Sequence, residues 1–174
     1  RYTYVAGEMA NGIASVELVL AMARAGMLGF FGAAGLDPTT IARSIQRIQD
    51  ALEPAVPFGS NLIHSPHEPA LEAATVDVYQ KLNVPNVCAS AYLGLTPMVV
   101  RLRCAALRRA ADGRVTSDRR LIAKVSRVEV ARRFLSPPPE KMLRELVTAG
   151  QITNEQALLA AAFPMCDDLT AEAD

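Results

Sequence analysis

Small, amide and charged residues recur where the short apolar runs of this sequence end. In chain order they are Gly7, Glu8, Met9, Gly32, Asn61, His64, Ser90, Lys124, Ser126, Arg127, Glu172 and Asp174. If the apolar runs are parallel strands, their carboxyl ends meet at one rim, where cofactors and substrates bind. Small residues, an amide, a lysine and carboxylates on one rim suit a flat polar heterocycle such as a flavin.

Four of these residues have a chemical and a structural interpretation. Asn61 can donate to and accept from a pyrimidine-type edge, or it can satisfy backbone groups at a strand end. Met9 can lie against a ring or pack in the protein, and Glu8 can be an ordinary loop carboxylate. Lys124 could place positive charge near the part of a flavin that becomes anionic on reduction. A functional role is favoured for Lys124, because an unpaired ammonium group in an apolar strand is costly.

The first 36 residues predict a strand–helix–strand unit. An apolar run over residues 4–6 ends at Gly7, and Ser15 can cap a helix that ends at Gly26. A second strand over residues 27–31 follows and breaks at Gly32. This is the size of a βαβ crossover, although the glycine spacing matches neither a dinucleotide-binding nor a phosphate-binding loop.

The same alternation of strand and helix continues along the chain. Further strands are predicted over residues 58–63, 86–91, 121–125 and 169–173, and further helices over 38–52, 69–82, 97–111, 129–135, 140–149 and 153–162. Alternation of this kind predicts an α/β fold with a parallel sheet, either doubly wound or closed as a (β/α)₈ barrel, the TIM barrel. The barrel normally needs about 250 residues, and this chain of 174 supplies about six of its units.

Charge and cysteine content limit the classes of partner and site. The 18 basic and 18 acidic residues cancel, so no overall field favours nucleic acid or a membrane surface. Eleven basic residues cluster between Arg101 and Arg133, which predicts a solvated face or a surface for an acidic protein. The three cysteines form no CxxC pair, so a zinc site is not expected, and free thiols favour the cytoplasm. His64 and His67 lie in a proline-rich loop, which favours an ordinary surface role.

Four segments carry a resemblance to a known family. Residues 6–36, 57–69, 122–134 (IAKVSRVEVARRF) and 164–174 resemble the PfaD-type enoyl reductases of polyunsaturated fatty acid and polyketide synthesis. Those enzymes fall within the flavin-dependent nitronate monooxygenase and 2-nitropropane dioxygenase-like group. The resemblance implies a TIM barrel, bound FMN, NADPH or NADH as hydride donor, and reduction in trans of enoyl thioesters on acyl carrier protein. It also implies acyl carrier protein or polyketide synthase modules as partners, and a homo-oligomer is compatible with it.

The resemblance places candidate cofactor-binding residues on this chain. They are Ala6, Gly7, Glu8 and Met9 in the flavin-facing first loop, Asn61 on the third strand, Lys124 on the fifth, and Asp174 at the opening of the sixth loop. Glu8 stands where a small residue is expected, so we expect it to crowd the flavin. No catalytic residue is assigned.

The family pattern continues beyond the last residue of this sequence. It runs into a loop that contains Ser-Gly-Gly-His and then into strands that hold the FMN phosphate. We therefore expect residues 1–174 to be the N-terminal part of a flavin-binding barrel that is poorly active alone. A nitronate-oxidising flavoenzyme of the same barrel, and a non-catalytic fragment or docking module, remain alternatives.

Overall fold

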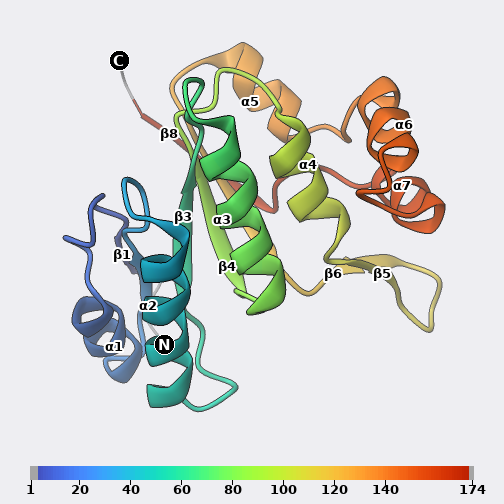
Figure 1. Ribbon diagram of the computed structural model, residues 1–174. Helices are drawn as coiled ribbons and strands as arrows, with labels where there is room; N and C mark the ends of the chain where they lie inside the picture. Colours follow the sequence, from blue (N-terminus) through green and yellow to red (C-terminus); the bar gives the residue numbers. More distant parts are fainter. Residues whose placement is uncertain (1–3, 173–174) are drawn as a thin grey trace. The chain divides into compact units, whose positions relative to one another are not determined.

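The computed structural model describes residues 4–172 (Figure 1). Two compact units divide between Cys88 and Ala89, and each is described by itself. The predicted position of Asp174 lies outside the described residues.

The first unit repeats a strand followed by a helix three times. Its elements are β1 (Val5–Gly7), α1 (Val16–Arg24), β2 (Leu28–Phe31), α2 (Pro38–Ala51), β3 (Gly59–Ile63), α3 (Pro69–Lys81) and the first three residues of β4 (Asn86–Ser90). β1 pairs with β2, and β2 with β3, in parallel. α2 contacts both α1 and α3, so the three helices form a row in chain order (Figure 1).

Two helices of the first unit, α1 and α2, begin where their capping residues predict. The Ser15 side chain accepts a hydrogen bond from the backbone N–H of Leu18 at 3.3 Å and thereby caps α1. Asp37 accepts two backbone N–H groups at the start of α2, which has Pro38 at its first position. One face of α2 is buried through Ile41, Ile45 and Ile48, as their spacing predicts.

The second unit contains a hairpin and two extra helices beside its strands. Its elements are the end of β4, α4 (Pro97–Cys104), β5 (Leu107–Arg109), β6 (Val115–Ser117), β7 (Arg120–Val125), α5 (Val128–Phe134), α6 (Glu140–Thr148), α7 (Asn154–Ala160) and β8 (Asp168–Ala171). β7 and β8 pair in parallel, with Lys124 opposite Thr170. The predicted capping box of α7 is confirmed, since Thr153 and Gln156 exchange hydrogen bonds of 3.1 and 2.9 Å.

The predicted arginine-rich helix over residues 97–111 is wrong in its second half. α4 ends at Cys104, and β5 and β6 form an antiparallel hairpin closed by a turn through Asp112 and Gly113. Gly113 has φ +84°, which suits the Asp-Gly turns of hairpins. Arg108 and Arg109 therefore lie exposed on β5 rather than on a helix face. Because β7 begins at Arg120, directly after the hairpin, they lie towards its amino-terminal end.

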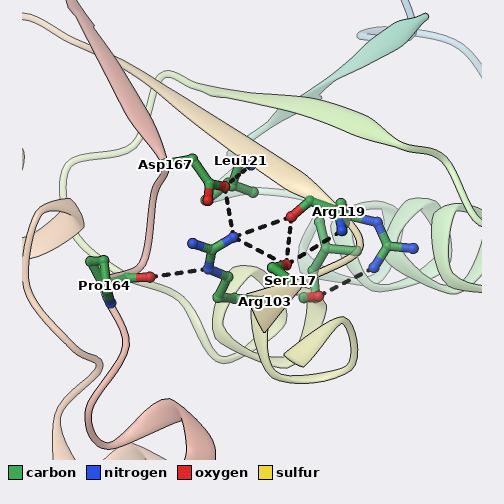
Figure 2. Close-up of polar contacts among 7 residues, drawn as sticks. Arg103, Ser117, Arg119, Leu121, Pro164 and Asp167 are labelled. Carbon is green, nitrogen blue, oxygen red and sulfur yellow. Dashed lines mark hydrogen bonds and ion pairs between the residues drawn. The ribbon is translucent and has the colours of Figure 1, made fainter. Parts of the chain in front are cut away.

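Arg103 is also placed differently from the predicted exposed face, because its side chain is buried in a polar network (Figure 2). Its Nη1 lies 2.7 Å from Asp167 Oδ2 and donates to the Arg119 carbonyl oxygen at 3.2 Å, while its Nε donates to the Pro164 carbonyl oxygen at 3.0 Å. Asp167 Oδ2 also accepts the backbone N–H of Leu121 at 2.7 Å. The network thus ties the end of α4 to the starts of β7 and β8.

The strand order distinguishes the two predicted architectures. The strands of the main sheet follow one another as β1-β2-β3-β4-β7-β8, which is their order in the sequence. A doubly wound sheet reverses its strand order at a switch point, whereas a (β/α)₈ barrel keeps the sequence order throughout. The chain therefore has the fold of about six β/α units of a TIM barrel. No helix within residues 4–172 is long and apolar enough to cross a membrane.

Candidate functional site

The loops that follow β1 and β2 are joined by backbone hydrogen bonds. Gly12 N donates to the Gly32 carbonyl oxygen at 2.9 Å, and Asn11 N donates to the Ala34 carbonyl oxygen at 2.7 Å. A Cβ atom on Gly32 would lie only 1.8 Å from the Met9 carbonyl oxygen. The close approach of the two loops therefore requires glycine at position 32.

Gly7 and Met9 form the start of this rim. Gly7 has φ +119°, and a Cβ atom there would lie 2.1 Å from the Phe30 carbonyl oxygen. The side chain of Met9 is 51% exposed, so it is not a core residue in the first unit. Ala6, which pairs with Gly29 in the sheet, is half-buried. The predicted first loop thus offers exposed backbone and one exposed apolar side chain.

Asn61 holds the second loop against β3. The residue is 4% exposed, and its Oδ1 accepts the backbone N–H groups of Ala33 at 2.8 Å and Ala34 at 3.2 Å. Both partners are donors, so the orientation of the amide is fixed and its Nδ2 points away from them. Asn61 therefore satisfies backbone groups near the strand end, which is one of its two predicted roles. Only its two Nδ2 hydrogens remain to bind a ligand.

A buried tyrosine supports β3 from the helix layer. The Tyr79 hydroxyl on α3 donates to the Asn61 carbonyl oxygen and lies 2.7 Å from Ser60 Oγ. Burial raises the pKa of Tyr79 well above its ordinary value, so the hydroxyl stays protonated. The backbone that carries Asn61 is thus held by a neutral hydrogen bond.

Glu8 reaches across the first unit to Cys88. The Cys88 thiol on β4 donates to Glu8 Oε1 at 3.2 Å, although β2 and β3 separate β1 from β4 in the strand order. Three strand spacings amount to about 14 Å in a flat sheet, which is too far for one glutamate side chain. The sheet of the first unit must therefore curve, with Glu8 and Cys88 on its concave side. This partner of Glu8 could not be predicted, since the two residues are 80 positions apart.

A histidine–carboxylate pair lies at the end of β3 and was not predicted. His64 directly follows β3, and its Nδ1 lies 3.0 Å from Oε2 of Glu72, in the first turn of α3. The side chain of Glu72 is 3% exposed and that of His64 is 21% exposed. Glu72 also lines a small pocket of about 20 Å³ together with Asn61 and Thr75. No periodicity or motif in the sequence pairs His64 with Glu72.

Lys124 belongs to the second unit. Its Nζ lies 3.5 Å from Glu172 Oε1, and its side chain is 29% exposed. Leu121, Ala123 and Val125 form the buried face of β7, so Lys124 lies on the opposite and more open face. The ammonium group therefore lies beside a carboxylate in a partly hydrated setting rather than buried in the strand.

The predicted residues fall into two groups. Ala6, Gly7, Glu8, Met9 and Asn61 lie at the strand ends of the first unit, and Lys124 lies on β7 of the second. Within residues 4–172 no group of three or more His, Cys, Asp or Glu side chains could hold a metal ion. The side chains described at these strand ends are hydrogen-bond donors, a lysine, carboxylates and one oriented imidazole.

Known proteins of two biosynthetic systems match nearly the whole chain. A polyunsaturated fatty acid synthase protein from Thraustochytrium sp. is 48% identical over 168 residues, which are 97% of this chain and 11% of that protein. Polyketide biosynthesis protein ThaF from Burkholderia thailandensis is 45% identical over 174 residues, which are 100% of this chain and 15% of that protein. The chain therefore spans only a small part of each of these relatives. No family model matches the chain.

A solved structure also matches nearly the whole chain. The enoyl reductase domain of MlnA, from the macrolactin biosynthesis cluster of Bacillus amyloliquefaciens, superposes with a TM-score of 0.95 at 38% identity. The match covers 99% of this chain and 40% of that one. This chain is thus homologous to segments of polyunsaturated fatty acid synthase and polyketide biosynthesis proteins, and it shares the fold of the MlnA enoyl reductase domain, which confirms the resemblance predicted from its sequence.

Proposed function

We propose that the protein containing this chain is an FMN-dependent enoyl reductase. It uses NADPH or NADH to reduce enoyl thioesters that acyl carrier protein presents in trans during polyketide or polyunsaturated fatty acid synthesis. Residues 1–174 supply the N-terminal part of its flavin-binding barrel. The observation that carries the proposal is the match to the MlnA enoyl reductase domain over 99% of this chain. The complete protein, called the parent protein below, is the object of every experiment.

The strand ends of the first unit fit a flat, polar cofactor. Gly7 leaves exposed backbone at the rim, and Met9 offers an exposed apolar surface for a ring. Asn61 has two N–H donors left after its oxygen is used, which suit the acceptor atoms of an isoalloxazine ring. Glu8 is turned towards Cys88, and whether it crowds the flavin stays a prediction.

These residues would bind and orient the cofactor while its own chemistry carries the electrons. Bound FMN supplies a two-electron carrier between a nicotinamide and the β-carbon of the enoyl thioester. The overall reaction consumes one NAD(P)H and one proton, and it yields NAD(P)⁺ and the saturated thioester. Lys124 would contribute positive charge beside the ring, where the reduced cofactor is anionic.

The carrier protein requires a docking surface on the same side as the strand ends. Arg108 and Arg109 lie towards the amino-terminal end of β7, so they do not suit this role. α5 begins just after the carboxyl end of β7 and carries the exposed residues Arg132 and Arg133. A Cβ atom on Gly94, in the loop after β4, would lie 3.0 Å from Arg133. We assign the acidic carrier to the α5 arginines for this reason.

Spectroscopy and turnover together test the proposal. The purified parent protein should show flavin absorbance, and mass spectrometry of the released cofactor should identify FMN. NADPH or NADH should be oxidised when crotonyl thioester is added, under nitrogen. Oxygen consumption with a nitronate and no reaction with the thioester would favour the nitronate-oxidising alternative. A colourless protein that takes up no flavin would favour a non-catalytic module.

A matched pair of charge reversals tests the docking surface. Arg132→Glu with Arg133→Glu should raise the apparent KM for a carrier-bound substrate, because exposed charges mainly affect association. Turnover of a small free thioester should change little. Arg108→Glu with Arg109→Glu serves as the control on the hairpin and should leave both substrates unaffected. A larger effect from the hairpin pair would show that the carrier binds elsewhere.

A further inference from the structure

His64 and Glu72 form an oriented pair at the carboxyl end of β3. His64 Nδ1 lies 3.0 Å from Glu72 Oε2, and the carboxylate is almost fully buried at 3% exposure. Glu72 lies in the first turn of α3, where the helix dipole stabilises negative charge. A buried acceptor beside Nδ1 selects the tautomer that carries its hydrogen there and fixes the plane of the ring.

The position of the pair agrees with a role in chemistry. Barrel enzymes place their reacting groups at the carboxyl ends of the strands. His64 follows the strand that carries Asn61, and Asn61 and Glu72 line the same small pocket in the first unit. A histidine held by a carboxylate also occurs as a metal ligand. A histidine oriented in this way is also suited to proton transfer.

The reduction of an enoyl thioester needs a proton as well as a hydride. Addition of hydride at the β-carbon leaves an enolate, and the α-carbon must then be protonated to give the saturated thioester. The best donor has a pKa near the working pH, which at neutrality means an imidazole. His64 offers such a group directly after β3, whereas His67, three residues further on, is exposed.

We propose that His64 is the proton donor of the reduction and that Glu72 is its positioning residue. The inference rests on the proposed enoyl reductase function. In this step the N–H bond of the imidazolium breaks, a C–H bond forms at the α-carbon, and the ring is left neutral. The imidazole then regains its proton from water, so one solvent proton is consumed in each turnover.

The test separates the two half-reactions in the parent protein by stopped flow. His64→Gln keeps a side chain that can donate to Glu72 but cannot act as an acid. We expect flavin reduction by NADPH to stay within about twofold of the wild type. Reoxidation by crotonyl thioester should slow by about 10²–10⁴-fold, the usual contribution of a general acid. His67→Gln, three residues away in the same loop, is the matched control and should leave both rates unchanged.

A second readout does not depend on turnover. In ¹⁵N-histidine-labelled parent protein without flavin, His64 should show the tautomer protonated at Nδ1. Glu72→Met removes the acceptor, so it should abolish that preference and should slow only the reoxidation step. Retention of the tautomer in Glu72→Met would contradict the positioning role.

Two outcomes would overturn the proposal. Equal reoxidation rates in His64→Gln and His67→Gln, with an active wild type, would show that His64 gives no proton. Equal loss of both half-reactions together with the flavin would show that the pair only supports the fold. A wild type with bound flavin and no reaction with enoyl thioesters would instead refute the proposed function, and this inference with it.

Discussion

Asn61 offers a way to separate structural support from cofactor binding at a single residue. Asn61→Ala removes the acceptor of two buried backbone N–H groups, those of Ala33 and Ala34. Each N–H left without a partner costs about 1–3 kcal/mol, so the variant should lose about 2–6 kcal/mol of stability. A loss of about 4 kcal/mol lowers the Tm of a domain of about 150–250 residues by roughly 8–16 °C, and that of the longer parent protein by less.

Asn61→Asp keeps the accepting oxygen and removes both N–H donors. The two backbone N–H groups still have a partner, and they also stabilise the new negative charge. We therefore expect Asn61→Asp to melt much closer to the wild type than Asn61→Ala does. Its affinity for FMN should nevertheless fall, because the donors to the ring are lost and a negative charge replaces them.

Thermal melting of the apoprotein and FMN titration of the parent protein measure the two effects. Hydrogen exchange of residues 32–36 adds a local readout, and these amides should exchange faster in Asn61→Ala than in Asn61→Asp. If Asn61→Ala melts with the wild type, the hydrogen bonds contribute little to stability. If Asn61→Asp binds FMN as tightly as the wild type does, the Nδ2 hydrogens do not contact the cofactor.

Three further predictions concern the second unit. Arg103→Met should lower the free energy of unfolding in urea by about 3–5 kcal/mol, because it leaves the Asp167 carboxylate without its buried partner. Arg108→Met on the exposed hairpin should lower it by less than about 1 kcal/mol. Equal losses in the two variants would contradict the network in Figure 2. Lys124→Met should leave the melting temperature nearly unchanged, and it should weaken FMN binding or slow the reduction of FMN. If both the cofactor content and the reduction rate are unchanged, the role of the lysine is structural. Burial raises the pKa of Cys104 to about 12 and that of Cys166 to about 11, from an ordinary 9.0. Below pH 9 both thiols are neutral in the folded protein and in the unfolded protein. Above pH 9 the thiols ionise only in the unfolded protein, so the free energy of unfolding should fall with rising pH. The fall should reach about 1.4 kcal/mol for each thiol and each pH unit, until the pKa of the thiol in the folded protein is reached. Urea midpoints from pH 8 to 10.5 measure this fall, and Cys104→Ala should reduce its slope; an identical slope would refute the assignment.

The local parts of the fold could be predicted from the sequence because short-range contacts decide them. Ser15, Asp37 and Thr153 cap their helices through bonds to residues two or three positions away. The strands are apolar runs of ordinary length, and their alternation with helices predicts the parallel order. A sequence pattern expresses such relations directly.

The hairpin could not be predicted because local propensity was equivocal. The Asp112–Gly113 pair suits both the end of a helix and the turn of a hairpin. The choice depends on packing, since α7, some 50 residues further along the chain, contacts β5. A prediction from helical spacing alone therefore ends this helix at residue 111, whereas α4 ends at Cys104.

The candidate site could be predicted as a set of positions but not as a set of interactions. Asn61 and Glu8 were identified because they stand at strand ends. Their partners lie 27 to 80 residues away, and the Glu72 partner of His64 lies on the next helix. Such pairs depend on the curvature of the sheet and on the docking of α3, which no local pattern encodes.

Anaerobic turnover of a carrier-bound enoyl thioester by the parent protein tests the central claim most directly. Crotonyl-loaded acyl carrier protein is mixed with NADPH and the FMN-loaded protein, and the carrier is weighed by intact mass spectrometry. Our account predicts a shift by the mass of two hydrogens, with one NADPH oxidised per acyl chain. An unchanged carrier mass, beside flavin that NADPH reduces normally, would contradict it.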